Sequence, residues 1–175
     1  MKFRLTLLAA VAATVAATTA SAATVSANAV ANATIVAPAT MTATRTLEFG
    51  TIAKPTTGVS TITVNSGAAA SVTPVLSGAG NAFVPTAGQA RAATFRLVGT
   101  PNQAIAVNTT SLNFTNQGGN FTNVGPQSPV ASVGTLTQLP AGGMDDFFVG
   151  GHFDISPTTT AQAYTGTLTL AIDFN

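Results

Sequence analysis

The sequence contains no cysteine and no tryptophan, and only 6% of its residues are charged. The lack of cysteine excludes disulfides, thiol nucleophiles and thiolate metal sites. The lack of tryptophan and the single tyrosine argue against a glycosidase, which needs two carboxylates across a protected cleft and rings to hold the sugar. Because a typical soluble domain has about a quarter of its residues charged, solubility here must come from Thr, Ser, Asn and Gln. Such a weakly self-repelling surface suits packing against copies of the same chain, or it reflects the general composition of the host's proteins.

The N-terminus carries the pattern of a cleavable signal peptide of the bacterial type. Lys2 and Arg4 precede an apolar stretch at 5–17, and Ala-Ser-Ala at 20–22 has the small-x-small pattern of a cleavage site. The apolar stretch is shorter than the roughly 20 residues that a membrane-spanning helix needs. We therefore expect export to the periplasm, the outer surface or the medium, with cleavage before Ala23 and no membrane span afterwards.

Removal of that peptide changes the charge balance. The remaining chain has four basic and five acidic residues, which gives it a small negative net charge. The basic residues are Arg45, Lys54, Arg91 and Arg96, and the acidic ones are Glu48, Asp145, Asp146, Asp154 and Asp173. Nucleic-acid binding needs clustered basic residues on one face, so no nucleic-acid partner is expected. The remaining length suits one domain.

The mature chain reads as short β-branched runs separated by Gly, Pro, Asn and Ser, which predicts an all-β fold. The last run is the clearest, because Leu168, Leu170, Ile172 and Phe174 alternate with polar or small residues. Many short strands with turns between them favour an immunoglobulin-like or pilin-like antiparallel β-sandwich. The expected strands are 46–52, 59–64, 70–76, 94–98, 104–107, 112–114, 130–139, 147–155 and 164–174.

The segment that follows the predicted cleavage site, 23–37, also alternates. Its odd positions from Val25 to Ile35 are apolar and mostly alanine, its even positions from Thr24 to Thr34 are polar except Val30, and Pro38 ends it. It is either the first strand of its own sandwich, a strand donated to the open sheet edge of a neighbouring subunit, or a disordered leader. We divide the chain into a signal peptide (1–22), this alternating segment (23–37) and a sandwich domain (38–175).

Few residues offer chemistry. The only histidine, His152, shares a strand face with Asp154, with Ser156 beyond, but no Gly-x-Ser-x-Gly turn presents a nucleophile. Asp145 and Asp146 lack the repeated carboxylates of a calcium loop, and we interpret them as an ordinary polar turn. We therefore predict no enzyme, and no catalytic, cofactor-binding or metal-binding residues.

Two patches carry a family resemblance. The first is Thr-Leu-Glu-Phe-Gly-Thr-Ile at 46–52. The second is Gly-Gly-His-Phe-Asp-Ile at 150–155, which leads into Tyr-Thr-Gly-Thr-Leu-Thr-Leu at 164–170. Together they resemble a widespread family of secreted bacterial domains of unknown function, the one numbered forty-four-oh-two. The chain is distantly similar to archaic chaperone–usher fimbrial subunits, in which an alternating N-terminal strand follows the export signal. It departs from many of those subunits in having no cysteine for a disulfide.

The motifs have structural roles of their own. Leu47 and Phe49 should share one face, and Gly50 should let the chain bend or a neighbouring backbone approach closely. The Tyr164 hydroxyl should bind backbone beside a bulge or close crossing at Gly166.

These patterns predict a non-enzymatic structural or adhesive cell-surface subunit that polymerises by strand donation. Its partners would be copies of itself or other surface subunits. Its acceptor groove would lie beside the last strand, lined by Leu168, Leu170, Ile172 and Phe174. The alternative is a monomeric exported module that binds a polysaccharide or a protein.

Overall fold

The computed structural model describes residues 27, 29, 30, 32, 33, 35, 38–116, 120–132 and 137–174. The chain divides into two compact units, Met1–Thr34 and Ile35–Asn175, and the fold described below belongs to the second. Its described residues form strands and loops without a helix, so the expected all-β fold is confirmed.

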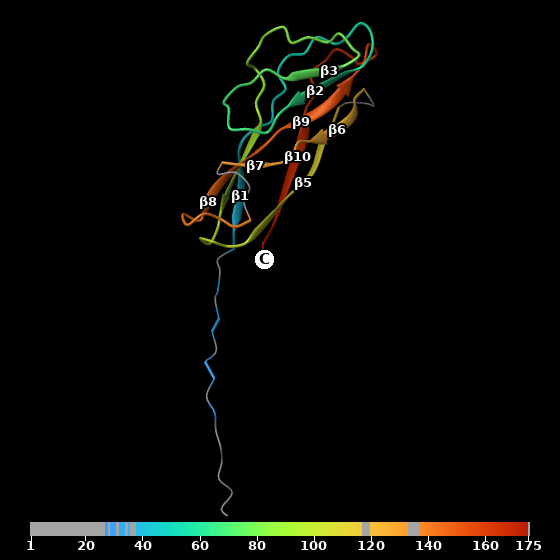
Figure 1. Ribbon diagram of the computed structural model, residues 1–175. Coiled ribbons are helices and arrows are strands. Elements are labelled where there is room, and N and C mark those ends of the chain that lie inside the picture. Colours follow the sequence, from blue (N-terminus) through green and yellow to red (C-terminus); the bar gives the residue numbers. More distant parts are fainter. Residues whose placement is uncertain are drawn as a thin grey trace, which may run out of the picture. The chain divides into compact units, whose positions relative to one another are not determined.

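Within the described part of the chain, ten strands form three sheets in which every pairing is antiparallel (Figure 1). Sheet 1 has the order β1 (Thr40–Arg45), β4 (Ala93–Val98), β8 (Met144–Val149), β7 (Val130–Ala131). Sheet 2 pairs β10 (Gly166–Phe174) with β5 (Ile105–Phe114). Sheet 3 has the order β3 (Val75–Gly78), β2 (Ser60–Val64), β9 (Gly151–Ile155), β6 (Thr122–Pro126).

Sheets 1 and 2 face each other across one hydrophobic core, which makes a β-sandwich. Phe95 and Leu97 on β4 and Phe147 on β8 enter this core from sheet 1, and Ile105 on β5 and Leu170 on β10 enter it from sheet 2. The alternation of Phe95 and Leu97 with the exposed Arg96 is the period-two pattern that a strand with one buried face requires.

A second core, rich in phenylalanine, lies on sheet 3. Phe153 of β9 stands at its centre, with the rings of Phe49, Phe114 and Phe121 at centroid distances of 4.8, 5.3 and 4.5 Å. Since Phe114 ends β5, sheet 2 contributes to both cores. Aromatic pairs at these distances stabilise a core beyond the area that they bury.

Gly150 connects sheet 1 to sheet 3. The chain leaves β8 in sheet 1 and enters β9 in sheet 3 through this one residue. A Cβ atom here would lie 1.9 Å from the carbonyl oxygen of Val64, so no other residue fits without a backbone shift.

Every expected run except 46–52 overlaps an observed strand, but the details differ. The run 147–155 is two strands in different sheets, β8 and β9, because Gly150 interrupts it. Among the described residues, only 130–131 of the run 130–139 and 75–76 of the run 70–76 lie in strands. The stretch 46–52 is not a strand, and only Glu48 makes a bridge, to Arg91. β1 and β6 were not expected, and the runs 104–107 and 112–114 belong to one strand, β5. β1 has no large alternating side chains and is exposed along most of its length, so the sequence has no hydrophobic alternation that would predict this strand.

The expected signal peptide, 1–22, lies outside the described residues. In the segment 23–37 the structure describes six positions (27, 29, 30, 32, 33 and 35), all exposed and outside the strands. Its role as a strand therefore stays a prediction. In the part of the chain that is described, no helix is long and apolar enough to cross a membrane.

Candidate functional site: the open side of the sandwich

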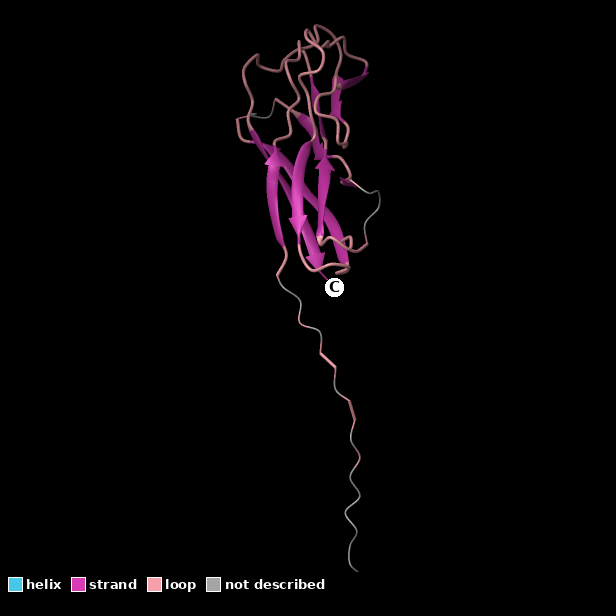
Figure 2. Cartoon of the chain, turned by 90° about the vertical axis from the view of Figure 1, so that its left-hand side faces the viewer, coloured by secondary structure: helices cyan, strands magenta, loops and turns pink. Residues whose placement is uncertain are grey.

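One side of the sandwich is not closed by a strand ladder. Among the described residues, β10 pairs only with β5, and β1 pairs only with β4. A groove with a volume of about 870 Å³ runs between the end of β1 and the start of β10. Figure 2 shows the strands of the folded unit from a side turned by 90°.

The groove has two walls and an apolar floor. One wall is formed by Ala43 of β1 followed by 46–52 and Lys54, and the other by 159–168. The floor consists of core side chains that remain reachable between the walls: Ala93, Leu112, Phe114, Phe121, Phe153 and Ile155. An apolar groove with polar groups at its rim is the common form of a binding site.

Hydrogen bonds to backbone hold the second wall in place. The Tyr164 hydroxyl donates to the carbonyl oxygen of Thr160 at 2.7 Å, which confirms the expected tie to backbone, and the ring packs 4.3 Å from that of Phe121. Lys54 reaches across from the first wall and donates to the carbonyl oxygens of Pro157 and Thr159, at 3.0 and 3.2 Å. The walls therefore meet at this end of the groove.

The first wall is attached to the sandwich on its outer side. The backbone N–H and carbonyl of Glu48 both bond to Arg91, at 2.9 and 2.8 Å, and the two side chains form an ion pair. Gly50 has a φ of +74°, which ends the extended run and bends the chain, as the motif predicted. Leu47 and Phe49 both line the groove and both approach Gly151: a Cβ atom built there would lie 3.0 Å from the Leu47 side chain and 3.2 Å from the Phe49 ring. The expectation that they share one face is therefore confirmed.

The open side continues beyond the groove along β10. Met41 of β1 is in register with the buried Leu97, so its side chain points to the core side of sheet 1, yet it is 37% exposed. Phe174 belongs to the core-facing set of β10 and is 41% exposed. Core-facing side chains stay exposed where no strand covers them, so the uncovered strip extends to the end of β10.

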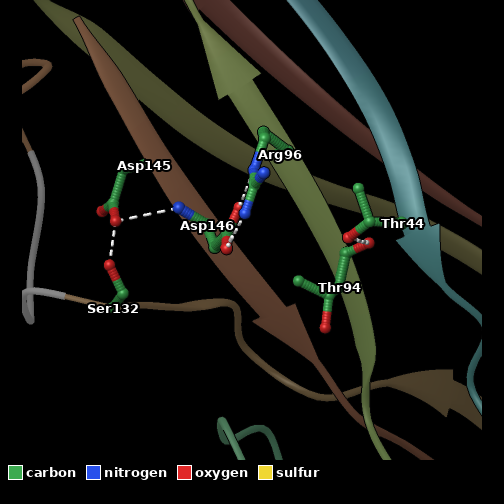
Figure 3. A network of polar contacts seen from close by, with 6 residues as sticks. All are labelled: Thr44, Thr94, Arg96, Ser132, Asp145 and Asp146. Carbon is green, nitrogen blue, oxygen red and sulfur yellow. Dashed lines mark hydrogen bonds and ion pairs between the residues drawn. The ribbon is translucent and has the colours of Figure 1, made fainter. Parts of the chain in front are cut away.

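The clearest electrostatic pair lies elsewhere, on the outer face of sheet 1 (Figure 3). The Arg96 guanidinium donates to both carboxylate oxygens of Asp146, at 2.8 and 2.9 Å. These hydrogen bonds lower the pKa of Asp146 below its usual value and raise the pKa of Arg96. The pair therefore braces β4 against β8 rather than forming a reactive site.

Asp145 and Asp146 are not the polar turn that the sequence suggested, because both lie on β8. Their side chains point in different directions, and the buried Asp145 accepts a hydrogen bond from Ser132 (Figure 3). Asp145 also accepts one from the backbone N–H of Asp146, at 2.8 Å. No group of three or more metal-ligating side chains occurs among the residues that the structure places.

His152 and Asp154 share one face of β9, as expected, but each is engaged by other residues. The Nδ1 atom of His152 lies 3.0 Å from Nε2 of Gln127, and Asp154 accepts a hydrogen bond of 2.6 Å from Thr61. Ser156 bonds within its own turn, with its hydroxyl 2.8 Å from that of Thr158. These contacts do not form a nucleophile–histidine–carboxylate relay.

The four residues expected to line an acceptor groove do not all lie in it. Leu168 lines the groove, whereas Leu170 is buried in the first core and Ile172 packs against that core. Phe174 lies on the exposed continuation. The sequence did not indicate that 46–52 and 159–165 contribute to the walls, because neither segment is a strand.

No curated protein and no solved structure matches the chain. One family model does, and it covers residues 39–174, which is nearly all of the folded unit. The expected resemblance to that family is thereby confirmed, and the described fold spans the matched region from β1 to β10. The chain therefore belongs to the family described as Domain of unknown function (DUF4402).

Proposed function

We propose that this protein is an exported, non-enzymatic structural subunit that assembles with copies of itself at the cell surface. In this proposal, the open side of the sandwich accepts an added β-strand. The observation that carries it is the apolar groove between two strand edges, β1 and β10.

An unpaired strand edge beside exposed apolar side chains is a surface that pairs readily with another chain. Backbone N–H and C=O groups on such an edge bond to an incoming strand, and side-chain sites between the sheets accept its alternate residues. Proteins that stay monomeric usually protect such edges with charges, prolines or bulges. On the stretch of β10 that borders the groove, 166–168, no charged residue or proline occurs.

The proposed occupant is the segment 23–37 of a second copy. This stretch precedes β1, has a long apolar/polar alternation, and contains no charged residue. Its described side chains are exposed, with Val30 at 88% and Ile35 at 95%. In this proposal the segment becomes a strand on docking, and its apolar side chains cover the uncovered strip of the sandwich.

Two substitutions in the segment test the proposal. Ala31→Asp places a carboxylate on the apolar set, where docking would bury an unpaired charge at a cost of several kcal/mol. Asn32→Asp places the same charge on the polar set and is the matched control. The full-length chain is expressed so that the host processes it, and the mass of the product is measured by light scattering. We expect oligomers for the wild type and for Asn32→Asp, and monomers for Ala31→Asp.

A monomeric binding module is the second candidate, because the groove volume of about 870 Å³ also suits a small ligand. The ring of Tyr164 at the groove wall could stack on a sugar. The same experiment separates the candidates. If the wild type is a stable monomer and both variants match it, strand addition is wrong and the binding module is favoured.

A further inference from the structure

We propose that the segment 23–37 lies antiparallel to β10 of the next copy, with Ile35 beside Gly166 and Ala27 beside Phe174. This inference rests on the proposed function and adds the direction and the register of the added strand. It follows from how the side chains of the two strands match.

The apolar positions of the two strands complement each other in size. In this register, each large core-facing residue of β10 meets an alanine, so large and small side chains alternate across the pair and fill the space between the sheets. The four pairs are Ala33–Leu168, Ala31–Leu170, Ala29–Ile172 and Ala27–Phe174.

The polar faces agree with the same register. Val30 is the one apolar residue of the polar set that falls opposite β10 in this register, and it lies beside Ala171, the one apolar residue on the outward set of β10. A shift by two residues in either direction would place Val30 beside Asp173 or Thr169. Cross-strand pairs of like character stabilise a sheet, so these shifted registers are less favourable.

The direction follows from the two ends. Reversing the strand while keeping Val30 beside Ala171 would bring Val25 to Gly166 and leave Ile35 past Phe174, with no strand to cover it. In the antiparallel arrangement, Ile35 lies over Gly166, which has no side chain. The partly exposed Tyr164 is next to it, and the groove there has an aromatic floor.

The segment cannot reach this position on its own copy. The start of β1 and the end of β10 lie at the same end of the folded unit (Figures 1 and 2), and Ala39 and Ile172 pack against the same core. From that end to Gly166 is about 27 Å, for eight residues at about 3.4 Å each. Only five residue steps connect Ile35 to Thr40, and they span at most about 18 Å. The antiparallel register therefore requires a second copy and generates an open, head-to-tail chain.

Disulfide cross-linking distinguishes the two directions. Because the chain has no cysteine, each introduced thiol is the only one in its protomer. Protein carrying Asn32→Cys is mixed with protein carrying Thr169→Cys or Asp173→Cys, allowed to assemble and oxidised. Residues directly opposite each other in a ladder are close enough for a disulfide. A parallel set with Asn28→Cys provides a second, independent site.

We expect covalent dimers from the pairs 32–169 and 28–173, with at least a tenfold lower yield from 32–173 and 28–169. The reverse preference means a parallel strand and overturns the inference. Equal yields, or no cross-link in samples whose mass shows intact oligomers, also overturn it while leaving strand addition in place. A wild type that remains monomeric overturns the proposed function together with the register.

Discussion

Phe153 is the residue whose loss should damage the fold most clearly, and the cost can be worked from its contacts. Its side chain is 5% exposed and touches three other phenylalanine rings, with centroid distances between 4.5 and 5.3 Å. Phe153→Ala removes this burial and leaves a cavity that the surrounding rings fill only in part. Such changes cost about 3–5 kcal/mol, from a total stability of about 5–15 kcal/mol. The melting temperature should fall by roughly 6–20 °C, at about 2–4 °C per kcal/mol for a chain of this size.

Phe83→Ala is the matched control, since it deletes the same atoms from a side chain that is 59% exposed. The control should change the free energy of unfolding by less than about 1 kcal/mol. Urea unfolding, followed by circular dichroism and Tyr164 fluorescence, measures both variants in the Ala31→Asp background, where assembly is not expected. Equal losses in both variants, or a loss below about 1 kcal/mol for Phe153→Ala, would refute the assignment of this cluster as the core of sheet 3.

Two further predictions concern the junction and the outer face. Gly150→Ala should destabilise the fold by about 3 kcal/mol or more, because the new Cβ atom meets backbone. Gly142→Ala is the control and should change the urea midpoint little, because its Cβ atom would meet only open space. Similar urea midpoints for the two variants would contradict the close crossing at Gly150. Asp146→Asn should destabilise at neutral pH, because the lowered pKa of Asp146 adds stability above its usual range near 4. That difference should shrink as the pH falls through the pKa of the folded state. A stability difference between the wild type and Asp146→Asn that stays constant from pH 7 to 2 would mean that the hydrogen bonds to Arg96 do not cause it.

The sequence predicted the fold class and most strands because their side chains alternate with a clear period. β10 is the best case: its alternating core-facing set is visible from Leu168 to Phe174. β1 was missed because an edge strand built from Thr, Met and Ala buries little, and β6 because Gly125 and a positive φ at Asn123 interrupt it. Hydrophobic alternation in a sequence indicates a strand with one buried face. β1 and β6 lack that alternation because they are held mainly by hydrogen bonds to neighbouring strands.

The site was predicted only in part, for a related reason. A groove does lie beside the start of the last strand, and Leu168 lines it, whereas its role as an acceptor of a donated strand stays a prediction. The first wall was mistaken for a strand, because Leu47 and Phe49 alternate as strand residues do. Their alternation comes from a bridged segment that packs over a groove and bends at Gly50. Which unpaired segments border a groove depends on the tertiary fold, and no local pattern carries that information.

Filling the groove with the isolated segment tests the central claim most directly. Monomeric Ala31→Asp protein is titrated with a synthetic peptide of residues 24–37, and the signal is the fluorescence of Tyr164, the only tyrosine, which lines the groove. We predict saturable binding of one peptide per protein, and none for a peptide with aspartate at position 31. A folded protein whose Tyr164 signal responds to neither peptide, or equally to both, would contradict the account.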